Sequence, residues 1–459
     1  MTAEHSILAG WASTDITPRA GGHPLGTLPC WMGGYAARTS PATAIHDPLC
    51  VYALALGTTA APLILLLCDL VAVDSALVVQ VRQRVLRTLP AATVWLSATH
   101  THSGPECASS VAFSPEPPDP AVLQGVLTAA VQAATSAIAH MHPVRLAWVS
   151  GPINGVATNR DHPDDGEPLS LDLLCCYELI PDPPVRPSAI FGSFPCHPTV
   201  LSADNLALSA DLPGAFRRYL GSVLGLVGSP PLQDPAADQG VGSPPLRGPA
   251  ASGNEIWIAL ATGAAGDIST RHMRQGQGFP ELDRLGALLA QQAYHYITRQ
   301  TPQLLPIASP IVRQQHINLT LKPMQPSEFL LEQQRSVASQ LDDALQAGNT
   351  AQARTLETTL QGLHALQNMA HRQHETHAEI SVADLGALTL VAIPGELYHS
   401  LGLAIQHAAT HVLILGYTNG YIGYLPTHAA YASLDYEVLI SPFAAGSGEQ
   451  VRDTAIGLL

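Results

Sequence analysis

The chain has 459 residues and a formal net charge of −15, from 21 Lys and Arg residues against 36 Asp and Glu residues. An acidic chain without a Lys/Arg cluster is a poor partner for nucleic acid or for an anionic membrane surface, so we expect neither partner. Only 12% of the residues are charged, while 20 histidines provide an unusual store of metal ligands and proton carriers.

The seven cysteines and the N-terminus indicate the compartment. The cysteine count is odd and no two cysteines have Cys-x-x-Cys spacing, which favours buried free thiols in a reducing compartment over a disulfide framework. Residues 1–10 lack the basic and apolar regions of a signal peptide. The most apolar run, 63–73, is interrupted by Asp69 and is too short to span a bilayer. We therefore expect a cytoplasmic chain without a transmembrane segment.

The first third of the chain predicts alternating strands and helices. Residues 11–50 are interpreted as a loop-rich start that contains a glycine-bearing stretch. The run 63–69 is apolar on both alternating faces, as in a central strand that is covered on both sides. Helical periodicity follows to about Leu89, and after a strand at 94–96 an Ala- and Val-rich helix is expected at about 120–140. This order is typical of an α/β fold.

The middle of the chain changes pattern. Three strand-like runs at 145–149, 169–179 and 189–194 are separated by Pro/Asp/Gly turns. A helix is expected to begin at Asp211, with Pro213 just inside it.

Residues 227–253 are a duplicated Pro/Gly/Ala tract, since the segment 227–232 recurs at 241–246. Such a tract cannot fill a core, and two copies are too few for a solenoid. We predict a disordered surface insertion.

The last third predicts a strand at 255–261, a helix at 280–299 and a two-helix hairpin over 326–378, followed by a strand hairpin that ends near Ile393. Taken together, the elements predict one large catalytic domain over residues 1–459. Its expected fold is mixed α/β (α+β), with mixed sheets flanked by helices.

Two histidines after the strand at 94–96 are the first candidate site. Successive strand residues alternate faces, so His100 and His102 are expected on the same side. Two imidazoles side by side suit a divalent metal better than a core, because each ring must otherwise find hydrogen-bond partners. The alternative is one satisfied surface histidine beside an incidental one, since His-x-His is a short and common motif.

Four further stretches look like active-site turns at strand ends: 194–199 with His197, 263–270 with Asp267 and Ser269, 393–396 with Glu396, and 419–427 with Tyr424. Each has an ordinary structural interpretation: a capping histidine, a glycine turn, a glutamate at a helix N-terminus, or packing tyrosines. Ligands gather at strand ends in α/β sheets, so the joint occurrence favours a metal site at the strand ends.

These motifs together resemble the neutral (non-lysosomal) ceramidases and their bacterial relatives, which are zinc amidohydrolases. The resemblance runs through 14–18, 46–49, 98–105, 196–199, 266–269 and 394–396, and it ends at Tyr424 and Tyr436. It covers nearly the whole chain apart from 227–253.

The resemblance implies roles for eight residues. The zinc ligands would be His100, His197, Glu396 and Tyr424, and the catalytic group would comprise Ser269 as the serine, Arg160 and Tyr436 as contacts to the substrate and the developing oxyanion, and His102 as a proton-handling neighbour of the metal. Two imidazoles and one carboxylate are the usual ligands of an open catalytic zinc, whereas a tyrosine ligand is less usual. Zinc lowers the pKa of its water to about 7 and polarises a carbonyl.

Departures from the family leave the substrate open. We expect no leader and no C-terminal immunoglobulin-like domain, and Thr270-Arg271 stand where the family often has a proline and an asparagine. The expected function is zinc-dependent hydrolysis of a small-molecule N-acyl amide, such as a ceramide-like lipid. Alternatives are another amide, a lactam or an ester, or a non-catalytic metal-binding protein on the same scaffold. A structural zinc site is disfavoured because none of the implied ligands is a cysteine.

Overall fold

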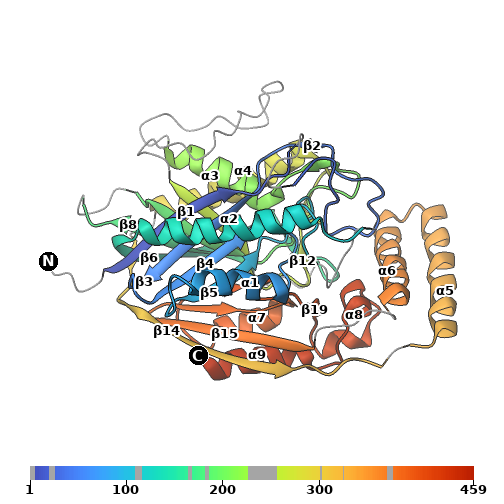
Figure 1. Cartoon of the computed structure of the whole chain (residues 1–459). Helices are drawn as coiled ribbons and strands as arrows, with labels where there is room; N and C mark the ends of the chain where they lie inside the picture. The colour runs from blue at the N-terminus through green and yellow to red at the C-terminus, as the bar shows by residue number, and fades with distance from the viewer. Residues whose placement is uncertain are drawn as a thin grey trace.

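The computed structural model describes residues 6–19, 26–108, 116–163, 168–180, 186–225, 256–299, 302–323, 325–369 and 376–459. The predicted insertion at 227–253 lies outside these residues. Within them the chain forms two main mixed sheets flanked by helices (Figure 1), so the predicted mixed α/β fold class is confirmed.

The larger sheet runs through the middle of the molecule. Its strands, in spatial order, are β11 (Trp257–Thr262), β9 (Ala189–Phe194), β8 (Ser170–Glu178), β6 (His142–Pro152), β1 (Ile7–Asp15), β3 (Cys50–Gly57), β4 (Pro62–Cys68) and β5 (Thr93–Ala98), while β13 (Gln303–Leu304) pairs with β6. The pairs β4–β5 and β9–β11, at the two sides of the sheet, are parallel. The β9 and β11 pair also follows the strand pattern predicted from the sequence.

Strand β4 shows why this sheet is central. Alternate residues Ile64 and Leu66 pack into the core beneath the first helices, while Leu63, Leu65 and Leu67 pack into the core between the two sheets. A strand that is apolar on both faces requires a cover on both faces. The double cover predicted for 63–69 is therefore confirmed.

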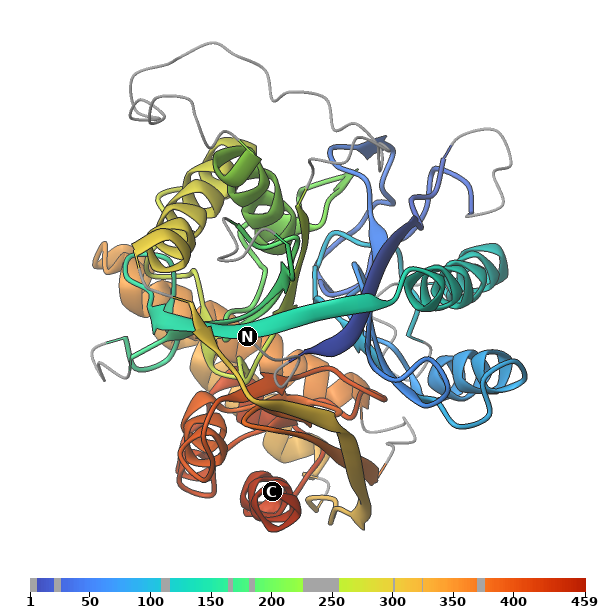
Figure 2. The same cartoon turned by 90° about the vertical axis from the view of Figure 1, so that its left-hand side faces the viewer.

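The second sheet lies against the larger one. Its order is β14 (Ile307–Asn318), β15 (His377–Gly386), β16 (Thr389–Ala392) and β18 (Val412–Leu415), with β16 and β18 parallel. Helices α7 (His399–Gln406) and α9 (Ser447–Leu458) cover its outer face. The result is a helix–sheet–sheet–helix arrangement, and Figure 2 shows the strands crossing between the helical layers.

Four helices cover the other face of the larger sheet. Helices α1 (Ser75–Leu86) and α2 (Pro120–Ala139) lie over β1, β3 and β4, and α3 (Asp211–Gly225) and α4 (Phe279–Arg299) lie over the strands on the β11 side. The predicted start of α3 at Asp211 is confirmed. In the described part of the chain, α2 alone is long and apolar enough to cross a membrane, and half of its apolar window is buried in the fold. It acts here as a core helix over β1 and β3.

A helical hairpin projects from one end of the molecule (Figure 1). It consists of α5 (Ser327–Gln346) and α6 (Thr350–Met369), as the sequence predicted for 326–378. Leu363 of α6 packs with Leu439 of the short helix α8 (Tyr436–Ile440), which follows a 3₁₀ turn η3 (Ala429–Ala432). The hairpin is thereby fixed to the segment that carries Tyr436.

One expectation from the sequence is wrong, and one strand was not predicted at all. The loop-rich interpretation of 11–50 misses most of β1 and the start of β3, which pair in register from Leu8↔Gly57 to Asp15↔Cys50. The pattern of β1 did not indicate a strand because many of its residues are small or polar. Small residues are needed there, since β1 passes so close to α2 that a Cβ on Gly10 would lie 2.1 Å from the Ala137 carbonyl oxygen. Strand β14 was also missed, because most of its side chains are exposed and show no apolar alternation.

The two edges of the larger sheet approach each other at one end. The Thr262 hydroxyl at the end of β11 donates to the Thr99 carbonyl just after β5, at 2.7 Å. The second sheet joins them there, since the Ser97 and Thr418 hydroxyls lie 2.7 Å apart. Two short strand pairs extend this end, namely β7 (Thr158–Asn159) with β12 (Ile268–Ser269) and β17 (Glu396–Leu397) with β19 (Tyr424–Leu425). A third pair, β2 (Ala44–Ile45) with β10 (Ala207–Leu208), leads into Ser209, whose amide donates to the Ser103 carbonyl at 2.9 Å. The strand ends of both sheets thus meet in one place.

Candidate metal centre

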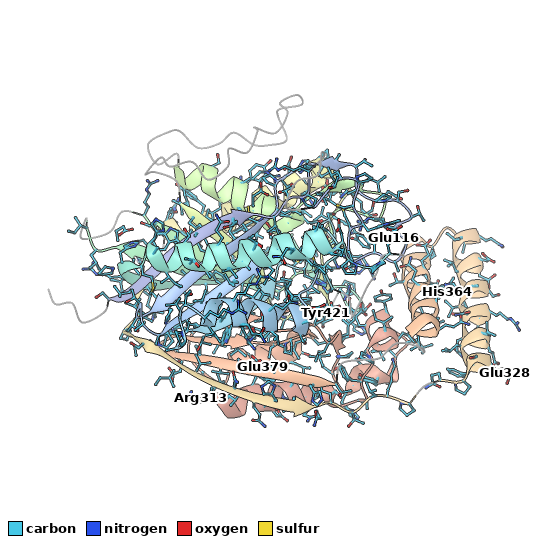
Figure 3. The ribbon with its side chains drawn as sticks, in the orientation of Figure 1. Glu116, Arg313, Glu328, His364, Glu379 and Tyr421 are labelled. Carbon is cyan, nitrogen blue, oxygen red and sulfur yellow. The ribbon has the colours of Figure 1, made fainter. Side chains whose placement is uncertain are left out.

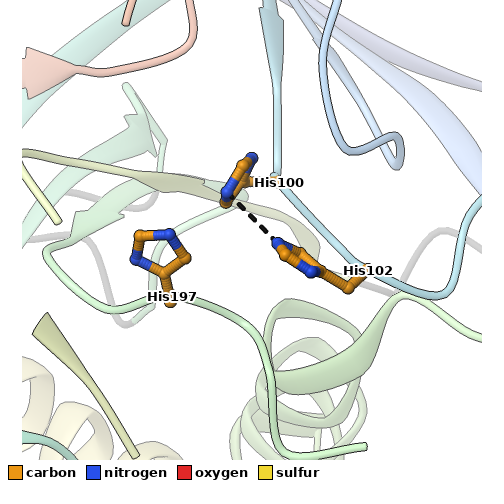
Figure 4. A group of neighbouring side chains, drawn as sticks. All are labelled: His100, His102 and His197. Atoms are coloured by element: carbon orange, nitrogen blue, oxygen red, sulfur yellow. Dashed lines mark hydrogen bonds between the residues drawn. The ribbon is translucent and has the colours of Figure 1, made fainter. Parts of the chain in front are cut away.

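Three histidine rings face one another at this meeting point (Figure 4). The Nε2 atoms of His100 and His102 lie 3.3 Å apart, and His197 comes from the turn after β9. One ligand atom from each ring lies within 4.8 Å of the others. The arrangement could hold a metal ion.

The rings of His100 and His102 lie close together, but strand alternation is not the cause. Strand β5 ends at Ala98, and His100 has a left-handed backbone with φ of 64°. This turn, and not a continuing strand, brings His102 back toward His100. The expected proximity is therefore correct, but the expected strand geometry is wrong.

The carboxylate and the phenol predicted as ligands also reach this point. Glu396 and Tyr424 are direct partners in the parallel β17–β19 pair. The Glu396 Oε2 atom lies 2.8 Å from His197 Nε2 and 3.5 Å from His100 Nε2. The Tyr424 hydroxyl lies 3.3 Å from His197 Nε2. All four residues that the sequence assigned to zinc are brought together.

Backbone carbonyls fix the orientation of two of the rings. The Nδ1 atom of His100 lies 2.6 Å from the Val71 carbonyl, and that of His197 lies 2.6 Å from the Ala265 carbonyl. A carbonyl can only accept, so Nδ1 carries the proton in both rings and the Nε2 lone pairs point inward. This is the tautomer that a metal requires.

Burial sets the charge of the site. Burial and the nearby Arg160 together lower the pKa of His197 to about 4, so the ring is neutral at pH 7. Burial also lowers the pKa of His102 well below its usual value. Burial alone would raise the pKa of Glu396, but His100 and His197 outweigh it and lower that pKa. Imidazoles whose Nε2 atoms face inward beside a carboxylate are a donor set that fits a divalent cation.

Two tyrosines that sequence reasoning did not assign to the site hold the carboxylate. The Tyr421 hydroxyl donates to Glu396 Oε1, and the Tyr417 hydroxyl donates to Oε2 at 3.4 Å. The Tyr417 ring also stacks on His100, with ring centroids 4.0 Å apart. Figure 3 shows Tyr421 in the interior of the molecule, near α1. The tyrosine-rich stretch 419–427, which contains Tyr421, was expected to be an active-site turn, but only Tyr424 within it was given a role.

A backbone contact places Ser269 beside the histidine centre. It forms an isolated parallel bridge with His197, and its hydroxyl accepts from the Arg271 amide at 3.3 Å. The Asp267 carboxylate in the same turn accepts from Asn159 at 2.9 Å and from the His399 amide at 2.7 Å. In the described residues Asp267 therefore braces the turn and makes no hydrogen bond to the Ser269 hydroxyl.

Arg160 and Tyr436 complete the predicted set. Arg160 donates to the Gly266 carbonyl and, at 3.2 Å, to the Tyr424 hydroxyl. The Tyr436 ring lies edge-on to the Tyr424 ring, with centroids 6.2 Å apart. A residue that the sequence did not suggest, Glu437, is fully buried, and its Oε1 lies 2.7 Å from Arg160 Nε. Its place directly after Tyr436 was the only signal.

The protein therefore belongs to the class of mixed α/β proteins that carry a buried histidine–carboxylate centre at the strand ends. No family model matches the chain, and no curated protein matches it. Solved structures do match, among them one described as a ceramidase complexed with C2, at 18% identity and a TM-score of 0.70, and the neutral ceramidase from Pseudomonas aeruginosa, at 18% identity and a TM-score of 0.71. Each match covers 99% of this chain, and 75% and 74% of the respective solved chains.

The chain therefore has the fold of bacterial neutral ceramidases over nearly its whole length. At this identity the likeness shows the fold. The resemblance deduced from the motifs is confirmed at that level.

Proposed function

We propose that the protein is a zinc-dependent hydrolase that cleaves the amide bond of an N-acyl substrate. The observation that carries this proposal is the convergence of His100, His197 and Glu396 on one point, with both histidine Nε2 lone pairs directed inward. A set of imidazoles and a carboxylate without thiolates is the usual donor set of a catalytic zinc site. Tyr424, whose hydroxyl is 3.3 Å from His197, would be the further ligand.

Zinc, when bound, supplies a water that is nucleophilic near neutral pH and polarises the amide carbonyl. The side chains around it have complementary tasks. Hydrolysis adds water across the C–N bond, so one proton must pass to the leaving amine as the acid is released. The hydroxyl of Ser269 and the ring of His102 lie beside the centre and would hydrogen-bond the reacting groups and handle this proton.

Arg160 and Tyr436 would stabilise the oxyanion that forms when the carbonyl is attacked. Arg160 is anchored by Glu437 and reaches the Tyr424 hydroxyl, so its guanidinium is held at the centre without rearrangement. One donor placed in this way is worth about 3 kcal/mol of transition-state stabilisation.

The substrate proposal rests on the solved ceramidases and on the chemistry of the site. Both neighbours are ceramidases by description, which supports an amide with a lipid-like acyl half for this chain. Another amide, a lactam or an ester is the alternative. We also propose a reducing, cytoplasmic setting, which the seven free cysteines support.

A panel of N-acyl amides assayed with and without a chelator tests the proposal. We expect the purified protein to hold about one zinc per chain and to hydrolyse at least one lipid-like amide, with activity lost on chelation and restored by zinc. Zinc binding without turnover of any amide, lactam or ester would instead indicate a metal-dependent binding protein.

A separate prediction concerns Glu437. Because its carboxylate is fully buried against Arg160, Glu437→Gln removes the charge that orients the guanidinium. We expect kcat to fall by about 10- to 100-fold with zinc content unchanged, since Arg160 acts on the transition state and not on the metal. Stopped assays and metal analysis check this. Glu449→Gln on α9, which caps the backbone at His428, is the matched control and should leave kcat unchanged. A Glu437→Gln enzyme with wild-type kcat would contradict the assignment.

A further inference from the structure

Glu379 is a charged side chain that the proposed mechanism does not use. It lies on β15 of the second sheet, and its side chain is 10% exposed. Arg82 on α1 donates to Oε2 at 2.7 Å and to Oε1 at 2.8 Å, and the Ser381 hydroxyl donates to Oε1 at 3.1 Å. Burial acts to raise the pKa of Glu379, but Arg82 and Ser381 outweigh it and lower that pKa, so the carboxylate is charged at pH 7. A charged carboxylate held in this way is a strong acceptor for a further donor.

That further donor comes from the turn at 417–421. The Asn419 Nδ2 atom donates to Glu379 Oε1 at 3.0 Å, while Oδ1 of the same side chain accepts from the Leu96 amide at 3.0 Å. The backbone amide of Asn419 donates in return to the Leu96 carbonyl at 2.7 Å. The buried Asn419 side chain therefore links β15 of the second sheet to β5 at the edge of the larger sheet.

The turn needs such an anchor because its backbone is unfavourable. Asn419 has a φ of 65°, and Tyr417, two residues earlier, has a φ of 54°. Asparagine tolerates this left-handed region, but a bulky tyrosine does not favour it. A backbone of this kind persists only where contacts from several sides fix it.

The same turn holds the carboxylate of the metal centre. The hydroxyls of Tyr417 and Tyr421 donate to the two oxygens of Glu396, one to each. Figure 3 labels Glu379 and Tyr421, which are joined through Asn419 and the backbone of the turn. A shift of the turn would therefore redirect both phenols and, with them, the Glu396 carboxylate.

From these contacts, and resting on the metal centre of the proposed function, we propose that Glu379 is a positioning residue for the metal ligand Glu396. It acts through Asn419 on the turn that carries the two tyrosines, and so fixes the Glu396 carboxylate before the metal arrives. Partners that orient a metal ligand typically contribute 10- to 100-fold in metal affinity. Zinc affinity is therefore the quantity that this role should change.

The test measures the zinc affinity of the folded proteins by competition with a chromophoric chelator. Glu379→Gln removes the charge and places an amide donor against the donors of Arg82 and Asn419, so we expect zinc to bind at least about tenfold more weakly. Asn419→Gly keeps the left-handed backbone, which glycine adopts readily, and removes only the side-chain link, so we expect a similar loss. Asp283→Asn, which breaks a 2.6 Å pair with Arg218 between α4 and α3, is the matched control and should keep wild-type affinity.

A double-mutant cycle separates positioning from general stability. Tyr421→Phe removes the hydroxyl that donates to Glu396 and should weaken zinc binding by about 10- to 100-fold. Because Glu379 acts through the same turn, Glu379→Gln should cost much less zinc affinity in the Tyr421→Phe background than in the wild type. A role in stability alone would lower the unfolding temperature and leave the zinc affinity of the folded protein unchanged.

The outcomes distinguish this inference from the proposed function. If the wild type binds zinc and Asn419→Gly binds it within about twofold as tightly, the positioning role is overturned and the metal centre stands. Equal losses from Glu379→Gln in the wild-type and Tyr421→Phe backgrounds also overturn it. If Glu379→Gln does not fold, Asn419→Gly decides the question. A wild-type protein that binds no zinc overturns the metal centre itself.

Discussion

Replacement of His197 by alanine is expected to remove the metal and the hydrolytic activity together. Its Nε2 atom lies 2.8 Å from Glu396 Oε2 and 3.3 Å from the Tyr424 hydroxyl, so it is central to the donor set. Without it, only one imidazole held by a backbone carbonyl remains, beside the Glu396 carboxylate and the Tyr424 phenol, which is a less usual zinc ligand. We expect zinc to fall from about one per chain to background and kcat/KM to fall by more than about 1,000-fold, or ~4 kcal/mol.

Metal analysis after dialysis and amide hydrolysis are the two measurements. His364→Ala, on the exposed face of α6 (Figure 3), is the matched control and should keep both zinc and activity. Thermal unfolding distinguishes lost metal from lost fold, because added zinc stabilises only a protein that binds it. Full zinc occupancy in the His197→Ala protein would reject the proposed centre.

Much of this centre could be predicted because each ligand follows a strand. His197 ends the run 189–194, and Glu396 follows the run that became β16. Strand ends of α/β sheets gather ligands, so a joint site was a sound expectation even for His100 and Glu396, which are almost 300 positions apart. The sequence could not show that the sheet edges β5 and β11 approach each other, since that depends on tertiary contacts such as Thr262 with Thr99.

The residues that support the ligands were harder to predict than the ligands. Glu437 and Tyr417 have no motif of their own, and their roles arise from contacts to Arg160, Glu396 and His100. The left-handed backbone of His100 is likewise set by its surroundings, because a non-glycine residue does not favour a positive φ. Local pattern therefore located the reacting groups, while their orientation came from packing between distant segments.

The same contrast between local pattern and tertiary packing explains which strands could be predicted. Strand β4 was predictable because both of its faces are apolar and buried. Strand β1 was not, because small residues such as Gly10 serve close packing against α2 and leave no apolar alternation. Propensity identifies strands that bury large side chains and misses those that bury backbone.

Ser269→Ala is expected to give a folded, zinc-loaded protein that hydrolyses amides poorly. Among the described residues the Ser269 hydroxyl makes one hydrogen bond, accepting from the Arg271 amide at 3.3 Å, so its loss should cost about 1 kcal/mol of stability or less. Its backbone bridge to His197 does not depend on the hydroxyl, and the metal ligands should stay in place. We expect kcat to fall by about 100- to 1,000-fold, which is the usual cost of removing one group that acts on the transition state.

Zinc content, thermal unfolding and kcat measured on one preparation check the three parts of this prediction. Thr270→Ala removes the adjacent buried hydroxyl, which has no hydrogen-bond partner among the described residues, and it should leave kcat near the wild-type value. A large loss in both variants would mean that the turn, and not the Ser269 hydroxyl, is what the reaction requires. Wild-type turnover by Ser269→Ala would remove this serine from the mechanism and leave the reaction to the metal centre, Arg160 and Tyr436.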